Sequence, residues 1–177
     1  DRLKADVIVM GRRGRRGLAR LMLGHATAQV IGQAHCNVLV VPRAAKVAGR
    51  HIVLATDGSR FADAAAVTAG ALAQVCKTPL TVASVTTEDQ APEVRAEMTQ
   101  AVERVVAHMR ASGASVEGKV LHGEPATAIT GVARESGADL IVTGSHGRTG
   151  LERVLIGSTS ERILNATECA VLVVKAA

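Results

Sequence analysis

The fold is decided by residues 138–160, which read ADLIVTGSHGRTGLERVLIGSTS. The apolar stretch from Leu140 to Thr143 has the length and composition of a buried strand. It ends at Gly144, and further glycines follow at positions 147 and 157. The hydroxyl residues of 158–160 then open a segment with helical periodicity. This order of strand, glycine loop and helix predicts a turn at the carboxyl end of a strand in an α/β protein.

The beginning of the chain repeats its end. Displaced by 133 residues, positions 5–41 align without a gap with positions 138–174, and 16 of the 37 residues are identical. The matches include four glycines and the apolar stretch 38–41. We therefore predict a tandem protein, in which residues 1–43 are the C-terminal part of a first, incomplete domain. Residues 44–49 are then a linker, and residues 50–177 a complete domain.

Within 50–177, strand patterns alternate with helix patterns. We expect strands at 51–55, 80–85, 115–121, 140–143 and 171–174, and helices at 61–76, 92–110, 125–136 and 158–165. Five strands that alternate with four helices predict an α/β fold with a doubly wound, five-stranded parallel sheet. Ligands of such sheets bind at the carboxyl ends of the strands.

The composition narrows the class of protein. The chain has 177 residues, is 47% hydrophobic, and has a single aromatic residue, Phe61. An aliphatic core suits a parallel sheet under Ala-rich helices, and the missing aromatics disfavour proteins that stack single-stranded nucleic acid. No apolar run approaches the roughly 20 residues of a membrane span, so we expect no membrane partner. Three scattered cysteines favour a reducing, cytoplasmic location over a disulfide framework.

The glycine loop has a functional and a structural interpretation. Glycines let a backbone approach a phosphate, and a helix that begins at Ser158 and Thr159 supplies amides and hydroxyls to an anion. Glycine turns after strands are also common as purely structural loops. The loop has neither the Gly-Lys-Ser/Thr of a Walker A motif nor the dinucleotide motif Gly-x-Gly-x-x-Gly. Its position between a strand and a hydroxyl-capped helix favours phosphate binding.

Four features together resemble the universal stress protein (UspA-like) family. They are Gly-x2-Gly-x9-Gly-Ser at 144–158, the preceding Ala-Asp-Leu-Ile-Val at 138–142, Ala-Thr-Asp-Gly-Ser at 55–59, and the final Val-Leu-Val-Val at 171–174. The resemblance covers 50–177 and, through the repeat, 1–43. It implies an adenine nucleotide alpha hydrolase-like sheet of strand order 3-2-1-4-5 and a dimeric architecture. Because the glycine-serine motif is intact, it also implies a tandem-type, ATP-binding regulator of stress adaptation. Any Mg2+ is expected to be carried mainly by the phosphates of the nucleotide.

The same resemblance implies the ligand contacts. Asp57 corresponds to the acid that contacts the ribose or adenine, and Val85 to the backbone partner of the adenine ring. The phosphate and ribose shell corresponds to Gly144, His146, Gly147, Gly157, Ser158 and Thr159. In the first copy, His25 and Ala26 stand where Ser158 and Thr159 stand in the second. We therefore expect one competent site, in 50–177. Two departures from the family pattern are Ala55 and Ala170, where Pro is common.

Plainer interpretations remain for individual residues. Asp57 could simply cap a turn, and His146 is expected to be a solvent-facing loop histidine. No catalytic residue and no metal site can be placed, so hydrolysis is expected to be slow at most. The run from Gly11 to Arg16 is expected to bind an anion or to be solvated charge, and nucleic acid is not an expected partner. The alternative function is a nucleotide-free interaction or regulatory module of a larger protein.

The last strand of each copy is apolar. In the order 3-2-1-4-5 the fifth strand lies at the sheet edge, where an apolar strand needs a partner. Residues 38–41 and 171–174 can pair within one chain as a pseudo-dimer, or the strands of two chains can pair in a homodimer.

Overall fold

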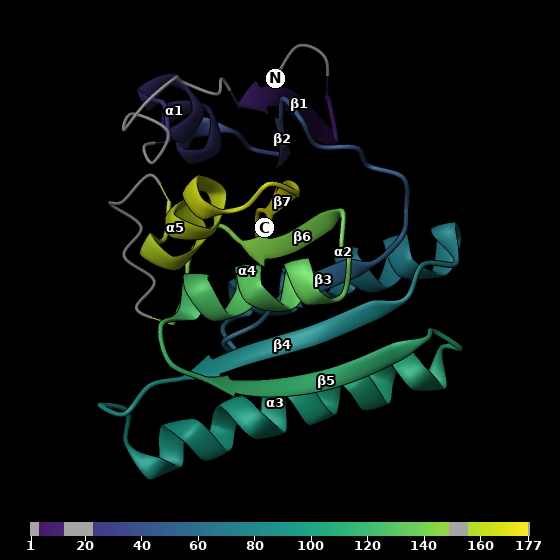
Figure 1. Cartoon of the computed structure of the whole chain (residues 1–177), viewed down its shortest axis with the longest axis vertical. Coiled ribbons are helices and arrows are strands. Elements are labelled where there is room, and N and C mark those ends of the chain that lie inside the picture. Colours follow the sequence, from purple (N-terminus) through teal and green to yellow (C-terminus); the bar gives the residue numbers. More distant parts are fainter. Residues whose placement is uncertain (1–3, 13–22, 149–155, 177) are drawn as a thin grey trace.

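The computed structural model describes residues 4–12, 23–148 and 156–176. The strands are β1 (Val7–Arg12), β2 (Asn37–Pro42), β3 (Ile52–Ala55), β4 (Leu80–Thr86), β5 (Val116–His122), β6 (Leu140–Gly144) and β7 (Ala170–Val174). The helices are α1 (His25–Gln33), α2 (Arg60–Cys76), α3 (Pro92–Ala111), α4 (Pro125–Glu135) and α5 (Ser158–Ala166) (Figure 1). Every strand and helix expected in 50–177 is present, with ends that differ by no more than one residue.

One sheet contains these strands in the order β1-β2-β7-β6-β3-β4-β5. Within 50–177 the order is β5-β4-β3-β6-β7, which is 3-2-1-4-5 when the strands are numbered along the chain, as expected. The pairs in this part are all parallel. The carboxyl ends of β3, β4 and β6 therefore lie at one edge of the sheet.

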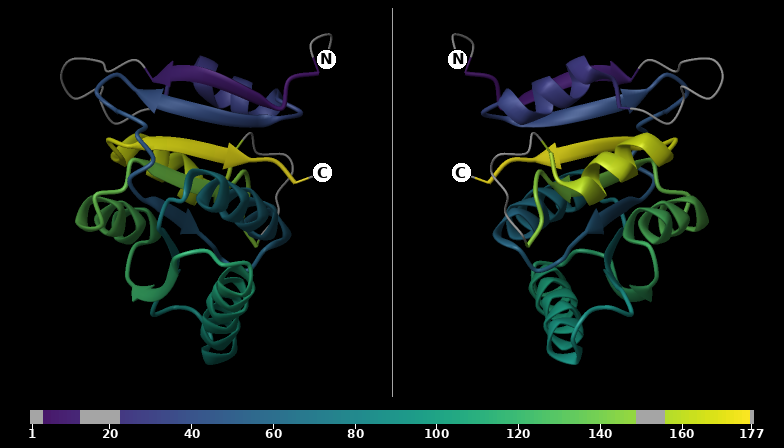
Figure 2. Two further views of the ribbon diagram at one scale, coloured as in Figure 1. Left: turned by 90° about the vertical axis from the view of Figure 1, so that its right-hand side faces the viewer. Right: turned by 90° about the vertical axis from the view of Figure 1, so that its left-hand side faces the viewer.

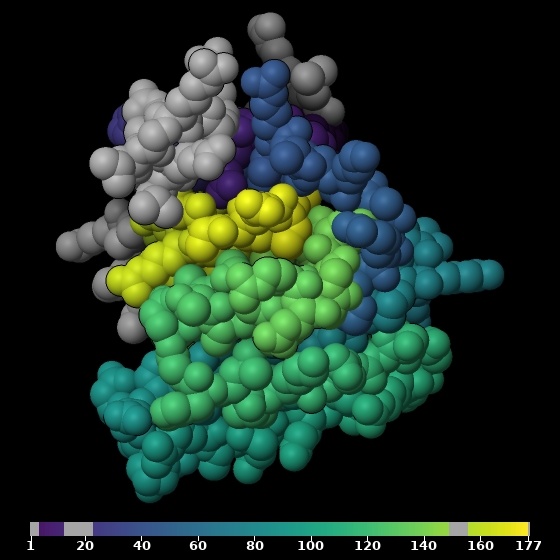
Figure 3. All heavy atoms as spheres, in the orientation of Figure 1, coloured from purple at the N-terminus to yellow at the C-terminus, as the bar shows by residue number. Residues whose placement is uncertain are grey.

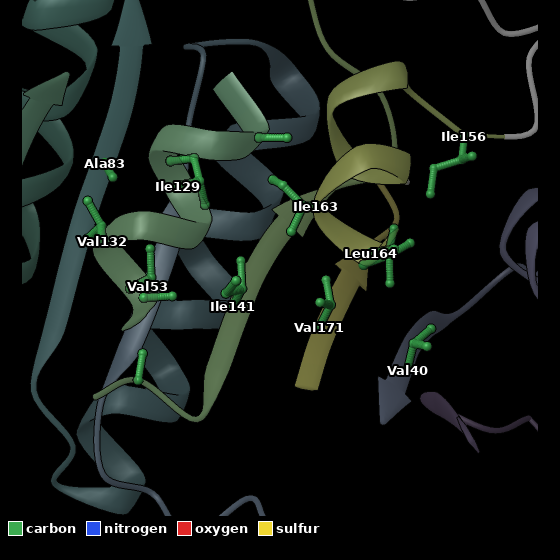
Figure 4. Close-up of a cluster of buried hydrophobic side chains, with 14 of the residues drawn as sticks. Val40, Val53, Ala83, Ile129, Val132, Ile141, Ile156, Ile163, Leu164 and Val171 are labelled. Carbon is green, nitrogen blue, oxygen red and sulfur yellow. The ribbon is translucent and has the colours of Figure 1, made fainter. Parts of the chain in front are cut away.

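Helices cover both faces of the sheet (Figure 2). On one face, α4 and α5 pack on the strands, and α1 packs on β1 and β2. The aliphatic side chains buried there include Val53, Ile129, Ile141, Ile163 and Val171 (Figure 4). On the other face, α2 and α3 cover a second cluster of buried residues that contains Leu54, Val82, Val142 and Leu172. Neighbouring residues of β6 thus point to opposite faces, as the geometry of a strand requires.

The two halves of the repeat meet at an antiparallel pair of strands, β2 and β7. Leu39 lies opposite Leu172, and these two residues occupy the same position in the repeat, so the pair is centred on an internal pseudo-twofold axis. The backbone amide of Lys175 extends the contact by donating to Asn37 Oδ1, at 3.0 Å. Strand β2 of the same chain therefore covers the apolar edge strand β7. Of the two pairings expected from the sequence, this is the one within a single chain.

The segment between the repeats is held by a buried carboxylate, Asp139, which sequence reasoning did not single out. Its side chain accepts hydrogen bonds from the backbone amides of Ala48, at 2.6 Å, and Arg50, at 3.2 Å. Burial by itself would raise the pKa of Asp139, which is 3% exposed, but amide hydrogen bonds from Ala48, Arg50 and His51 hold it below its ordinary value. Figure 3 shows blue atoms, from the part of the chain that includes the segment between β2 and β3, on the surface.

We expect Asp139→Asn to lower the free energy of unfolding at neutral pH by about 2 kcal/mol, because the amide nitrogen of Asn cannot accept a hydrogen bond. A carboxylate with a depressed pKa in the folded state stabilises the fold above its unfolded pKa, and this contribution is lost as the pH falls through the folded value. The wild-type chain should therefore lose stability from about pH 5 to pH 3, and the variant should lose less over that range.

Urea unfolding at a series of pH values measures both effects. Glu103→Gln, which changes an exposed carboxylate of α3, serves as the control. It should leave the free energy of unfolding at neutral pH and the loss of stability in acid unchanged. Equal acid sensitivity of the wild type and Asp139→Asn would contradict the assigned role of Asp139.

Candidate functional site

A cavity of about 310 Å3 opens at the carboxyl ends of β3, β4 and β6. All eight residues singled out from the sequence line it: Asp57, Val85, Gly144, His146, Gly147, Gly157, Ser158 and Thr159. They come from three strand ends, the glycine loop and the start of α5. The structure thus brings together residues that are up to 102 positions apart in the sequence.

Gly144 allows β6 to approach α2. A Cβ atom at this position would lie 2.8 Å from both the carbonyl carbon and the carbonyl oxygen of Phe61, in the first turn of α2. These are backbone atoms that cannot move aside easily, so only glycine fits. The close approach also sets where the chain turns into the glycine loop, next to the loop that follows β3.

Asp57 ties two loops together. Its Oδ1 accepts a hydrogen bond from the amide of Ser59 at 3.0 Å, and its Oδ2 accepts one from the amide of Arg148 at 2.9 Å. A Cβ atom on Gly147 would lie 2.8 Å from Oδ2, so this glycine makes room for the carboxylate. The bond to Ser59 is the turn that the plainer interpretation of Asp57 expected. The same carboxylate also lines the cavity, and each of its oxygens has a second lone pair for a ligand.

The start of α5 forms the polar end of the cavity. Gly157 precedes the helix, and no side chain caps it. The amide of Gly157 donates to the carbonyl of Ser145 at 2.8 Å, so the two ends of the glycine loop are in contact. First-turn amides of a helix lack intrahelical acceptors and attract anions. Those of Ser158 and Thr159 are at this cavity.

The third hydroxyl of this turn has a structural role. Ser160 is buried, and its Oγ donates to the carbonyl of Gly144 at 2.8 Å and lies 3.1 Å from Thr143 Oγ1. It therefore fixes the start of α5 against the end of β6. Sequence reasoning quoted Ser160 with its neighbours, but its inward orientation depends on the packing of the helix.

His146 is half-buried and packs on a side chain. Its ring centre lies 5.1 Å from that of Phe61, and its Nδ1 lies 3.1 Å from Ser145 Oγ. The expected solvent-facing histidine is therefore wrong, because the approach of β6 to α2 places this ring against the one aromatic residue of the chain. Its position at the cavity wall is as expected.

The other end of the cavity is aliphatic. Ala55, Ala83 and Val85 line it from the strands, and Met98 and Ile129 line it from α3 and α4. The sequence marked Val85 as a ligand contact and Ala55 as a departure from the family pattern, whereas Ala83, Met98 and Ile129 look like ordinary core residues and were not singled out. The cavity therefore joins an apolar slot to an anion-attracting helix start, which suits a ligand with a flat apolar part and a negatively charged part.

Two more polar residues missed from the sequence are Gln90 and Arg148, which also line the cavity. The guanidinium of Arg148 forms an ion pair with Glu97 of α3. Arg148 had a detectable signal, since it matches Arg15 in the repeat. Gln90 had none, because it lies in a loop without a motif.

Glu124 caps the start of α4 and forms an exposed ion pair with the middle of α5. Its carboxylate accepts hydrogen bonds from the amides of Thr127, at 2.7 Å, and Ala126, at 3.2 Å, and lies 3.4 Å from Arg162 Nη1 of α5. The hydrogen bonding of Thr127, opposed by partial burial and helped by Ala126 and Arg162, holds the pKa of Glu124 below its ordinary value. Pro125, the next residue, lines the cavity.

The run from Gly11 to Arg16 was expected to bind an anion or to be solvated charge. The structure describes Gly11 and Arg12 of this run, and Arg12 fits neither expectation. Arg12 is half-buried and donates hydrogen bonds to the carbonyl oxygens of Leu164 and Thr167, so it is neither an anion-binding residue nor solvated charge here. Arg13, Arg15 and Arg16 lie outside the described residues. Helix α1 begins at His25, without a side-chain cap.

Two classes of feature are missing from the described part of the chain. Among residues 4–12, 23–148 and 156–176, no group of three or more His, Cys, Asp or Glu side chains could hold a metal ion. No helix in these ranges is long and apolar enough to cross a membrane.

Fold and cavity define an α/β protein with a cavity at the carboxyl edge of the parallel strands β3, β4 and β6. The family model described as "Universal stress protein family" matches residues 1–42 and 49–175, and the chain belongs to that family. Universal stress protein MJ0531 of Methanocaldococcus jannaschii is 40% identical over 82 residues, which are 46% of this chain and 48% of that protein. Rv2005c of Mycobacterium tuberculosis is 28% identical over 188 residues, with 97% of this chain and 62% of that protein covered. The chain thus spans about half to three fifths of the length of these relatives.

Solved structures support the same fold. A universal stress protein from Archaeoglobus fulgidus superposes with a TM-score of 0.78 at 24% identity, over 98% of this chain and 62% of that one. A universal stress protein in complex with cAMP superposes with a TM-score of 0.60 at 26% identity, over 72% of this chain and 98% of that one.

We expect Gly144→Ala to lower the free energy of unfolding by about 3 kcal/mol, because the added methyl group meets the backbone of Phe61. Gly131→Ala is a matched control within α4, where an added Cβ atom meets nothing within 4 Å. It should stabilise the chain by about 0.5–1 kcal/mol, since alanine favours helix over glycine. Thermal and urea unfolding measure both, and a neutral Gly144→Ala would contradict the close contact.

Proposed function

We propose that the chain binds an adenine nucleotide, ATP in particular, in the cavity at the edge of β3, β4 and β6, and acts as a regulator in stress adaptation. The observation that carries this proposal is that one and the same cavity is lined by aliphatic residues of the strands and by the start of α5. Membership of the universal stress protein family supports it, as does the similarity to a member solved in complex with cAMP.

The proposed contacts divide the ligand into three parts. The adenine ring would lie in the aliphatic slot, against the backbone of Val85. Asp57 would accept a hydrogen bond from a ribose hydroxyl through a lone pair that the amides of Ser59 and Arg148 leave available. The phosphates would bind to the polar end formed by Gly144, His146, Gly147, Gly157, Ser158 and Thr159, where amides and the helix dipole favour negative charge.

Mg2+ would be held mainly through the phosphates, since this ion commonly keeps its waters and binds through substrate oxygens. We assign no catalytic residue, so that nucleotide binding, with hydrolysis slow at most, is the proposed activity. A cytoplasmic location is part of the proposal, because three cysteines scattered along the sequence suit a reducing compartment better than a disulfide framework.

We further propose a tandem organisation with one competent site. Residues 1–43 are the C-terminal part of a first domain, 44–49 the linker, and 50–177 the complete domain. The repeat and the pseudo-twofold pairing of Leu39 with Leu172 support this division. His25 and Ala26, at the start of α1, stand in place of Ser158 and Thr159, the first two residues of α5, which supports a single site.

Calorimetric titration of ATP, ADP, cAMP and GTP into the purified chain tests the nucleotide proposal. We expect adenine nucleotides to bind, and Gly147→Ala combined with Ser158→Ala to weaken binding by about tenfold or more through loss of a charge-assisted hydrogen bond and displacement of Asp57. Because the chain has no Trp or Tyr, adenine that co-purifies should also dominate its near-ultraviolet absorbance.

The matched control combines Gly131→Ala with Ser115→Ala, the same substitutions outside the cavity lining. It should bind as the wild type does. A wild-type chain that binds none of these nucleotides would favour the alternative, a nucleotide-free interaction module. Equal nucleotide binding by the cavity double variant and the control double variant would contradict the assignment of the site.

The pairing of β2 with β7 within one chain predicts a monomer in solution, of 18.2 kDa. Light scattering measures this mass. Val9→Lys adds charge to the outer edge strand β1, where Val9 is 62% exposed, and should not change the mass. A wild-type homodimer that Val9→Lys dissociates would show instead that β1 pairs between chains.

A further inference from the structure

Arg12 makes a contact that the proposed site does not explain. It ends β1 and occupies the repeat position of Ser145, in what would be the glycine loop of the first copy. Its guanidinium crosses to the other half of the molecule, where Nη2 donates to the carbonyl of Thr167 at 2.7 Å and Nη1 donates to the carbonyl of Leu164. These acceptors are 152 and 155 positions away in the sequence.

Both acceptors lie at the C-terminal end of α5. The last carbonyls of a helix have no intrahelical donors, and this end carries the negative pole of the helix dipole. A guanidinium offers several N–H donors in a planar fork together with a positive charge. Burial lowers the pKa of Arg12 from its ordinary value, while the nearby Glu168 acts in the opposite direction. The group nevertheless remains charged at neutral pH.

The opposite end of α5 is the polar end of the cavity. The helix has nine residues, a length of about 13 Å, and an isolated helix of this length is marginal in water. The side chains of Ile163 and Leu164 anchor its second half in the core, and the hydroxyl of Ser160 anchors its start to the end of β6. Arg12 supplies a hydrogen-bonded anchor at its other end.

We propose that Arg12 is a positioning residue for the phosphate part of the nucleotide site. Through it, the first segment holds the C-terminal end of α5 and thereby fixes the start of this helix at the cavity. This inference rests on the proposed nucleotide function. Arg12 stands where the second copy has Ser145, and in this role it acts on the site in the other half of the chain.

Three variants test it. Arg12→Ala should weaken ATP binding about fivefold, a size typical of a cation removed from a helix C-terminus. Arg12→Lys keeps the charge but loses the planar fork, and should weaken binding about twofold. Arg43→Ala is the matched control, because Arg43 is exposed in the same segment and has no hydrogen bond or ion pair with any part of the chain that the structure describes. It should bind as the wild type does.

Adenosine provides a readout that a general loss of stability would not reproduce. Because Arg12 acts on the phosphate end, Arg12→Ala should bind adenosine as the wild type does while it binds ATP more weakly. Hydrogen exchange should be about tenfold faster at the amides of the last turn of α5, including that of Thr167, which bonds to Ile163.

The outcomes distinguish a failure of the role of Arg12 from a failure of the nucleotide function. Equal losses for adenosine and ATP, equal ATP binding by Arg12→Ala and Arg43→Ala, or unchanged exchange in α5 would overturn the role of Arg12 while the nucleotide function stands. No nucleotide binding by the wild-type chain would overturn the nucleotide function itself, and with it the coupling to α5. The exchange measurement would then still show whether Arg12 holds the helix.

Discussion

The antiparallel pairing of β2 with β7 is the interaction on which the rest of the structure depends. It turns two sets of parallel strands into one seven-stranded sheet and buries Val38, Val40, Val171 and Val173, which an open edge would expose. The same pairing brings the end of β1 to the end of α5. One physical cause therefore explains why β2 covers the edge of the sheet and why the two repeats are in contact. An apolar edge strand is stable only when it pairs with another strand.

Close backbone approach is the second constraint, and it builds the cavity. The absence of a side chain at Gly144 lets β6 lie against the first turn of α2, and the absence of one at Gly147 leaves room for the Asp57 carboxylate. Asp57 forms the turn with Ser59 that one interpretation of the sequence expected, and its carboxylate also lines the cavity, as the proposed ligand contact requires. A residue that shapes a loop in this way presents its remaining lone pairs to a ligand in a fixed orientation.

Local patterns predicted the elements of 50–177 to within one residue, because apolar periodicity, glycines and prolines act over a few positions. The eight candidate residues also line one cavity, because strand ends converge in a doubly wound sheet. Three contacts could not be predicted. Asp139 bonds to amides 89 and 91 positions away, Arg12 reaches α5 across the repeat boundary, and Ser160 points inward. Each of these three contacts depends on tertiary packing, which the neighbouring residues in the sequence do not reveal.

The antiparallel junction also gives the molecule two poles. Strand β1 ends at one pole with Arg12, whereas β6 ends at the other with Gly144, as the opposite strand directions in Figure 2 show. Arg12 and the mouth of the cavity therefore lie at opposite ends of the strands, and α5 extends between them, with its last turn at Arg12 and its first turn at the cavity.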